Sequence, residues 1–97
     1  MEFLVNINLR WPDDMGPDRR QEITVAERAH AAELIKLGHL KRMWRIPGQF
    51  ANWGLWEAKD ATEIHEILTS MPAYPYMAKV EVHPLAIHPV DPSPPAR

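Results

Sequence analysis

The chain has 97 residues, of which 45% are hydrophobic and 25% are charged, and its formal net charge is −2 at pH 7. This composition is typical of a single globular domain, and the lack of any block of basic residues excludes a protein that binds nucleic acid through its phosphates. The absence of cysteine excludes a disulfide scaffold, a thiolate metal site and a cysteine nucleophile. No apolar run approaches the roughly 18 residues that a membrane span needs, so we expect a cytoplasmic domain without membrane contact.

The first predicted element is a strand over residues 2–10. Phe3, Val5, Ile7 and Leu9 alternate with mainly polar residues, and this period of two is typical of a strand with one apolar face. The next seven residues, WPDDMGP, predict a loop because they combine proline, glycine and two aspartates.

A long helix is predicted over residues 18–37, and Gly38 provides its C-terminal stop. At about 100° per residue, one stripe of this helix should face the core. The stripe contains Ile23, Ala26, Glu27, His30, Leu34 and Leu37, and the opposite side carries Arg20, Arg28 and Lys36.

Glu27 lies in the middle of this mostly apolar stripe. Burial raises the pKa of a carboxyl group and can tune it as a general base near neutral pH. The structural alternative is that Glu27 pairs with His30, one turn away, or with an arginine of the sheet, because a buried carboxylate without a partner is costly. Helical spacing alone leaves both interpretations open.

Residues 39–46 and 50–57 predict a hairpin around the turn at Pro47 and Gly48. Arg42 and Arg45 should point to opposite faces of its first strand, so only one of them can serve a pocket. The hairpin must also send aromatic side chains to both faces, and an exposed aromatic cluster usually marks an interface or a pocket. We therefore favour a homo-oligomer over a solvated monomer. The aromatic residues are Trp44, Phe50, Trp53 and Trp56.

A second helix is predicted from the cap at Asp60 to about residue 71, and a last strand over residues 76–83. The order βαββαβ predicts the ferredoxin-like α+β fold, a four-stranded antiparallel sheet with two helices on one face. We expect one domain over residues 1–86 and a proline-rich C-terminal tail over residues 87–97, either frayed or laid along a neighbour.

The sequence gives little support for a metal site, a catalytic nucleophile or a cofactor-binding motif. The five histidines show no pair at metal-ligand spacing, so we expect no metal site. The sequence contains no Ser/His/Asp constellation, no phosphate-binding glycine loop and no dinucleotide fingerprint, so an enzyme with this sequence would work without a cofactor. Asn52 stands beside aromatic residues on its strand, where it could hold a ligand carbonyl or simply bond across the sheet.

Several short motifs occur at spacings that belong together. Residues 44–52, WRIPGQFAN, follow the pattern W-R-x-x-G-x-[YF]-x-N, and residues 71–77, MPAYPYM, look like L-P-x-[FY]-P-Y-[ML]. Glu27 in the first helix, His65 in the second and His88 before a proline add to the pattern, as does the run DMGP at residues 14–17. With these motifs, the chain resembles the muconolactone delta-isomerase family over nearly its whole length.

The resemblance implies a ferredoxin-like subunit in a homo-oligomer, decameric in that family, with the active site between subunits. It implies conversion of muconolactone to 3-oxoadipate enol-lactone in bacterial catechol breakdown, a 1,3-proton shift that needs a base and hydrogen-bond donors but no metal or redox group. Glu27 matches the family's acidic position and would be the base. Arg45 or Arg42 would bind the substrate carboxylate, and Asn52 would polarise the lactone carbonyl.

Three positions depart from the family's pattern and bear on the substrate more than on the fold. Thr24 stands where a lysine is expected, Phe50 where tyrosine is common, and His30 where an apolar or differently polar residue is expected. Together with Trp44, these three residues are further candidates for substrate binding. The alternatives are a lactone-dehalogenating or small-molecule-binding member of the same oligomeric fold and, from a different class, a structural module whose aromatic face is only an interface.

Overall fold

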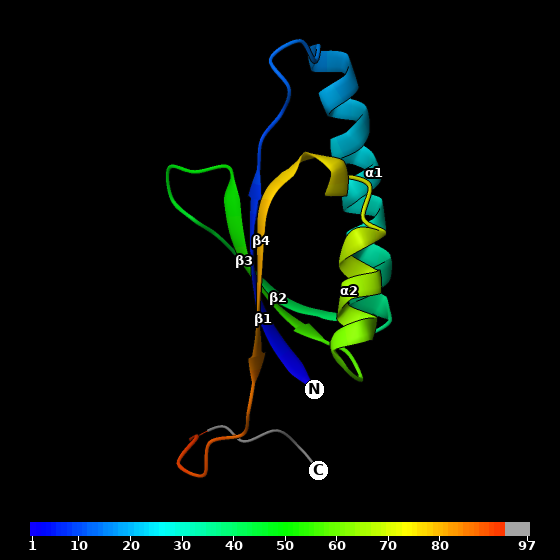
Figure 1. Cartoon of the computed structure of the whole chain (residues 1–97). Helices are drawn as coiled ribbons and strands as arrows, with labels where there is room; N and C mark the ends of the chain where they lie inside the picture. Colours follow the sequence, from blue (N-terminus) through cyan, green and yellow to red (C-terminus); the bar gives the residue numbers. More distant parts are fainter. Residues whose placement is uncertain (93–97) are drawn as a thin grey trace.

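Four strands form one antiparallel sheet that carries both helices on the same face. The computed structural model of the chain describes residues 1–92. The strands lie in the order β2-β3-β1-β4, and the two helices cover one side of them (Figure 1). This βαββαβ arrangement confirms the predicted ferredoxin-like fold. The elements are β1 (Glu2–Leu9), α1 (Pro17–Lys36), β2 (Leu40–Arg45), β3 (Ala51–Glu57), α2 (Ala61–Thr69), the short 3-10 helix η1 (Tyr74–Tyr76) and β4 (Met77–Leu85).

Local capping fixes one end of each helix. Gly38 adopts a φ of +82°, in the left-handed region that glycine tolerates, and the N–H of His39 donates to the carbonyl of Leu34 at 2.9 Å, which closes α1. At the start of α2, Asp60 Oδ1 accepts a hydrogen bond of 2.9 Å from the backbone N–H of Glu63. Both features are those predicted from the sequence.

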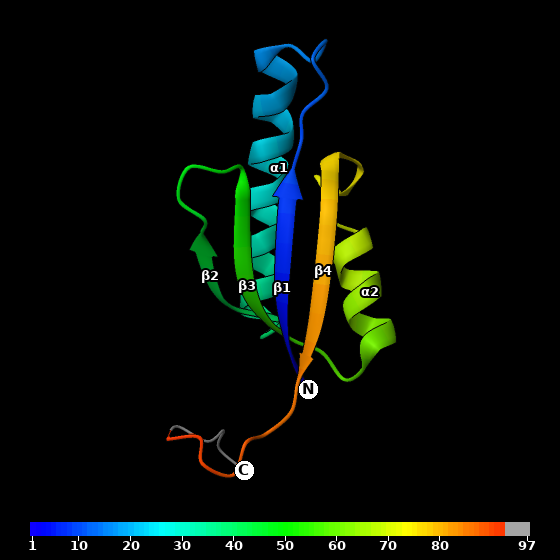
Figure 2. The ribbon, with the colours of Figure 1, turned by 60° about the vertical axis from the view of Figure 1, so that its left-hand side comes forward.

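The core lies between the sheet and the helices. Phe3, Val5 and Ile7, which alternate along β1, are buried there as predicted, and β3 adds Trp56, whose side chain is 0% exposed. The view in Figure 2 shows the four strands side by side, with α1 behind the middle of the sheet and α2 beside β4. The helical residues of this core are Leu34, Ile64 and Leu68.

The face of α1 that packs on the sheet is turned relative to the prediction. Ala26 and Leu37, which the predicted stripe included, are exposed, and Leu37 keeps 68% of its surface. Thr24 and Ala31 are half-buried instead. The reason is that apolar residues occur all around this helix, including the exposed Ile35, so their spacing defines its buried side poorly.

A β-bulge in β2 decides which hairpin side chains face the helices. Leu40 pairs with Trp56, but Arg42 already pairs with Leu55, so Lys41 is the extra residue. Beyond the bulge, the odd-numbered residues of β2 face the helices and the even-numbered residues face the open side of the sheet. A count of alternating positions from the start of the strand would give the opposite result.

The four hairpin aromatics point to both sides of the sheet, as predicted. Trp44 and Trp53 pair with each other on the open face, whereas Trp56 lies in the core. Phe50 precedes β3 and is 76% exposed.

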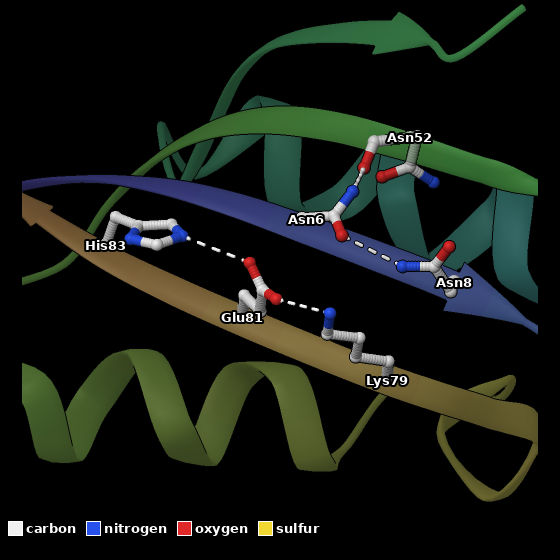
Figure 3. A network of polar contacts seen from close by, with 6 residues as sticks. All are labelled: Asn6, Asn8, Asn52, Lys79, Glu81 and His83. Atoms are coloured by element: carbon white, nitrogen blue, oxygen red, sulfur yellow. Dashed lines mark hydrogen bonds and ion pairs between the residues drawn. The ribbon is translucent and has the colours of Figure 1, made fainter.

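The open face of the sheet, opposite the helices, carries a polar network (Figure 3). Asn6 Nδ2 donates to the backbone carbonyl of Asn52 at 3.1 Å, and Asn8 Nδ2 donates to Asn6 Oδ1 at 2.8 Å. On β4, Glu81 forms an ion pair with Lys79 at 2.6 Å and a hydrogen-bond contact with His83 Nε2 at 3.4 Å, two residues away on either side.

After β4, residues 86–92 continue away from the body of the molecule without helix or strand (Figure 1). Ile87 and Val90 are exposed in this segment. The predicted tail, residues 87–97, runs beyond the described residues, and the division at residue 86 stays a prediction. Within residues 1–92, no helix is long and apolar enough to cross a membrane.

Candidate active site

A cavity of about 320 Å³ lies between α1 and the helix-facing side of the sheet. Its size is at the lower end of the range for small-molecule sites. Most of its wall is apolar, including Ile7 and Leu9 of β1, Met43 of β2 and Trp11 of the loop after β1. The cavity also has a small set of polar and charged wall residues, namely Thr24, Glu27, Arg28, Arg45 and Asn52.

Glu27 is held in this cavity by a contact from outside its own helix. Its Oε2 accepts a hydrogen bond of 2.6 Å from the backbone N–H of Ala73, the residue before η1. Its Oε1 is buried and has no hydrogen-bond partner within residues 1–92. One carboxylate oxygen is therefore anchored, and the other is left without a partner in the described chain.

Burial raises the pKa of the Glu27 carboxyl above its usual value, although the Ala73 hydrogen bond and the attraction of His30 act in the opposite direction. In the described part of the chain, Glu27 forms no ion pair with an arginine and no hydrogen bond with His30. The structure therefore does not show the alternative in which Glu27 is bonded to His30 or to an arginine of the sheet.

The sheet wall of the cavity brings Arg45 and Asn52 together. They are register partners on β2 and β3, and both face the helices. The backbone carbonyl of Asn52 is fixed by Asn6, while its side-chain Oδ1 is buried and has no partner among the described residues. Arg42 lies on the opposite face, with its guanidinium 4.9 Å from the centre of the Trp44 ring, so the structure brings Arg45 rather than Arg42 to Glu27.

Arg28 is a cavity residue that the sequence analysis missed. The predicted helix stripe puts it on the opposite side of α1, and it is indeed exposed, yet it also contributes to the wall of the cavity. Neither Arg28 nor Arg45 forms an ion pair within residues 1–92. Together with an ionised Glu27, the two arginines give the cavity wall a net charge of +1.

The remaining predicted site residues differ in whether they line the cavity that contains Glu27. Thr24 lines the cavity, although its hydroxyl donates to the backbone carbonyl of Arg20 at 2.8 Å. His30 does not line the cavity, and its Nε2 is buried without a partner in the described chain. Trp44 and the exposed Phe50 line an adjoining hollow that does not include Glu27. This hollow shares with the cavity the residues Leu9, Met43, Arg45 and Asn52.

Among residues 1–92, no three His, Asp or Glu side chains are grouped closely enough to hold a metal ion. The polar side-chain groups of the residues that line the cavity are one carboxylate, two guanidiniums, an amide, a hydroxyl and the indole N–H of Trp56. Such a set can exchange a proton with a ligand, bind an anionic group and donate hydrogen bonds to a carbonyl oxygen.

The sequence model of the muconolactone delta-isomerase family matches residues 1–91. The chain belongs to this family. Among curated members, Muconolactone Delta-isomerase 1 of Acinetobacter lwoffii is 38% identical over 89 residues, which is 92% of each chain. Muconolactone Delta-isomerase of Rhodococcus opacus is 37% identical over 89% of this chain and 91% of its own. The predicted family is therefore confirmed.

Solved structures agree with this family. A crystal structure of a muconolactone isomerase, 30% identical, aligns over 100% of both chains with a TM-score of 0.89. A 5-chloro-2-hydroxyhydroquinone dehydrochlorinase from Burkholderia phenoliruptrix aligns over 89% of this chain and 94% of its own, with a TM-score of 0.69 and 18% identity. At that identity, the second likeness shows the shared fold alone.

Proposed function

We propose that this chain isomerises muconolactone, or a close lactone analogue, to 3-oxoadipate enol-lactone in the breakdown of catechol. The observation that carries the proposal is Glu27, a buried carboxylate with one anchored oxygen and one unpartnered oxygen in a mostly apolar cavity. The names of the relatives support the substrate, since all seven curated matches, at 30–38% identity, are called muconolactone delta-isomerases.

The reaction moves one proton between two carbons of the lactone ring and shifts a double bond. In the proposed mechanism, Glu27 Oε1 removes the proton from the first carbon, and the electron pair of that C–H bond enters a dienolate whose charge collects on the lactone carbonyl oxygen. The same Oε1 returns the proton to the far end of the dienolate. No atom and no electron is gained or lost, so the chemistry requires only a base and donors for the oxygen.

The raised pKa of Glu27 suits this cycle, because a carboxylate that holds its proton more strongly is a better base towards carbon. The mostly apolar wall lowers the local dielectric, which strengthens the electrostatic effect of the few polar groups present. In the proposed complex, Asn52 donates to the lactone carbonyl oxygen. Arg45 binds the substrate carboxylate, and the net charge of +1 on the cavity wall suits a ligand with a single carboxylate.

The two arginines of β2 provide a matched test of this arrangement. Arg45→Gln removes a guanidinium from the cavity, whereas Arg42→Gln removes one from the opposite face of the same strand. We expect Arg45→Gln to raise the KM for muconolactone about 10- to 100-fold, as for the loss of a charge-assisted hydrogen bond, and Arg42→Gln to leave KM unchanged. Equal effects of the two variants, or turnover of only a halogenated lactone by the wild type, would argue against the proposal.

We further propose that the enzyme works as a homo-oligomer, a decamer in the cytoplasm, with the tail after β4 closing the cavity of a neighbouring subunit. Support comes from apolar side chains that a single chain leaves exposed, including Trp44 on the open sheet face, Ile35 on α1, Leu37 directly after it, and Val90 in the tail. Light scattering coupled to gel filtration measures the subunit number. Deletion from Val90 onward should raise the KM if the tail closes the site, and it should have no effect if the tail is only frayed.

A further inference from the structure

We propose that the indole N–H of Trp56 is a second hydrogen-bond donor to the lactone carbonyl oxygen, beside the amide of Asn52. This inference rests on the proposed function and assigns a further catalytic residue to it. It starts from an unusual feature of the cavity wall: Trp56 Nε1 is buried and has no hydrogen-bond partner within residues 1–92. Trp56 itself is 0% exposed and lines the same cavity as Glu27.

The position of the indole follows from the strand. Asn52, Gly54 and Trp56 alternate on β3, so all three face the helices. A Cβ atom on Gly54 would lie 2.5 Å from Trp56 Nε1 and 3.1 Å from its Cδ1. The N–H edge of the ring therefore lies over Gly54, the residue that stands between Asn52 and Trp56 on this face of β3.

An unpaired N–H in this place needs an explanation. A buried donor without an acceptor costs free energy, and tryptophan usually finds a partner for its N–H when it is buried. Within residues 1–92 no acceptor is bonded to it, and Asn52 Oδ1, Glu27 Oε1 and His30 Nε2 are also buried without a hydrogen-bond partner. A ligand oxygen in the cavity would supply the missing acceptor.

The arrangement also matches what a proton shift requires. Glu27 approaches the cavity from α1, on one wall, while Asn52 and Trp56 belong to the sheet on the facing wall. A lactone ring between the two walls can present its C–H bonds to Glu27 and its carbonyl oxygen to the sheet. Two preorganised donors on that oxygen would stabilise the dienolate as its charge develops.

The first test observes the indole directly. The chain has four tryptophans, so a relaxation-optimised ¹H–¹⁵N spectrum contains four indole peaks, and loss of one peak in Trp56→Phe assigns Trp56. The probe is the saturated lactone of muconolactone, which keeps the ring carbonyl and the carboxylate but has no double bond to move. We expect the Trp56 indole proton to move downfield on binding, while the Trp53 indole on the open face stays in place.

The second test is kinetic and uses neighbouring tryptophans as a matched pair. Trp56→Phe should lower kcat about 100-fold, as for other lost donors to a developing oxyanion, and Trp53→Phe should keep the wild-type kcat. Because Trp56→Phe also leaves a void in the core, a third variant carries benzothienylalanine at position 56. This residue replaces only the N–H by sulfur, so it keeps the ring shape and should lose kcat to a similar extent.

The inference is overturned if the benzothienylalanine variant retains wild-type kcat, or if the lactone binds without moving the Trp56 indole proton. In both cases the isomerase activity of the wild type would still stand. If instead the wild type fails to convert muconolactone, the proposed function fails. The spectrum with the saturated lactone then still decides whether the indole binds a lactone oxygen.

Discussion

Substitution of Gly54 by alanine tests how tightly the cavity wall is built. The new Cβ would lie 2.5 Å from Trp56 Nε1, whereas ordinary contact begins at 3.4 Å. The indole would have to move, but it is fully buried and packed in the core cluster on the sides that do not face the cavity. Overpacking of this kind costs about 1–3 kcal/mol, and the lower entropy of the unfolded alanine chain offsets about 0.4–1 kcal/mol of that cost. We expect a net loss of roughly 1–2 kcal/mol in the free energy of unfolding.

The assay is thermal and urea unfolding at a fixed protein concentration, because an oligomer's apparent stability depends on concentration. For a chain of this length, 1 kcal/mol corresponds to a fall in Tm of about 4–8 °C. The control is the same substitution in a Trp56→Phe background, which removes the clashing atom, so the two changes together should cost less than the sum of their separate effects. Unchanged stability of Gly54→Ala, or strictly additive effects of the two substitutions, would show that a Cβ at position 54 does not clash with the indole of Trp56.

Three further changes have defined outcomes. Asp60→Ala removes the cap on the Glu63 N–H and should cost about 1 kcal/mol; a variant as stable as the wild type in urea would contradict this. Asn6→Ala removes the donor to the Asn52 carbonyl and should also cost about 1 kcal/mol, and equal stability would mean that water replaces the bond. Because the folded-state pKa of Glu27 is raised, the folded protein binds that proton more strongly than the unfolded chain does. The free energy of unfolding should therefore decrease as the pH rises from the unfolded value, 4.5, through the folded one. Glu27→Gln should abolish this decrease in urea titrations between pH 4 and pH 8, and a decrease of the same size in the variant would assign it to another group.

The strand pattern of this sequence predicts the fold well, because β1 keeps one strictly apolar face. Phe3, Val5 and Ile7 are all buried, as alternation requires. The hairpin is harder, because the bulge at Lys41 reverses the alternation within β2. The sequence shows only that Arg42 and Arg45 point in opposite directions, and the pairing with β3 is needed to decide which of them enters the cavity.

Part of the site depends on tertiary contacts that no local pattern encodes. The anchor of Glu27 is a backbone N–H at Ala73, 46 residues away along the chain, and backbone groups leave no mark in the sequence. The place of the exposed Arg28 in the cavity wall is not predictable either, because the apolar residues of α1 do not define one face. The role proposed for Trp56 depends on Gly54, because a side chain at position 54 would occupy the space of the indole N–H edge. Only the structure shows that the two residues meet in this way.

Whether Glu27 is the base of a lactone isomerase is decided by proton NMR of muconolactone in D₂O with the wild type and with Glu27→Gln. We expect the wild type to form the enol-lactone. In Glu27→Gln, which keeps an acceptor for the Ala73 N–H, we expect at least a 100-fold loss of rate with an unchanged sedimentation profile. Conversion by Glu27→Gln at close to the wild-type rate would show that another group is the base.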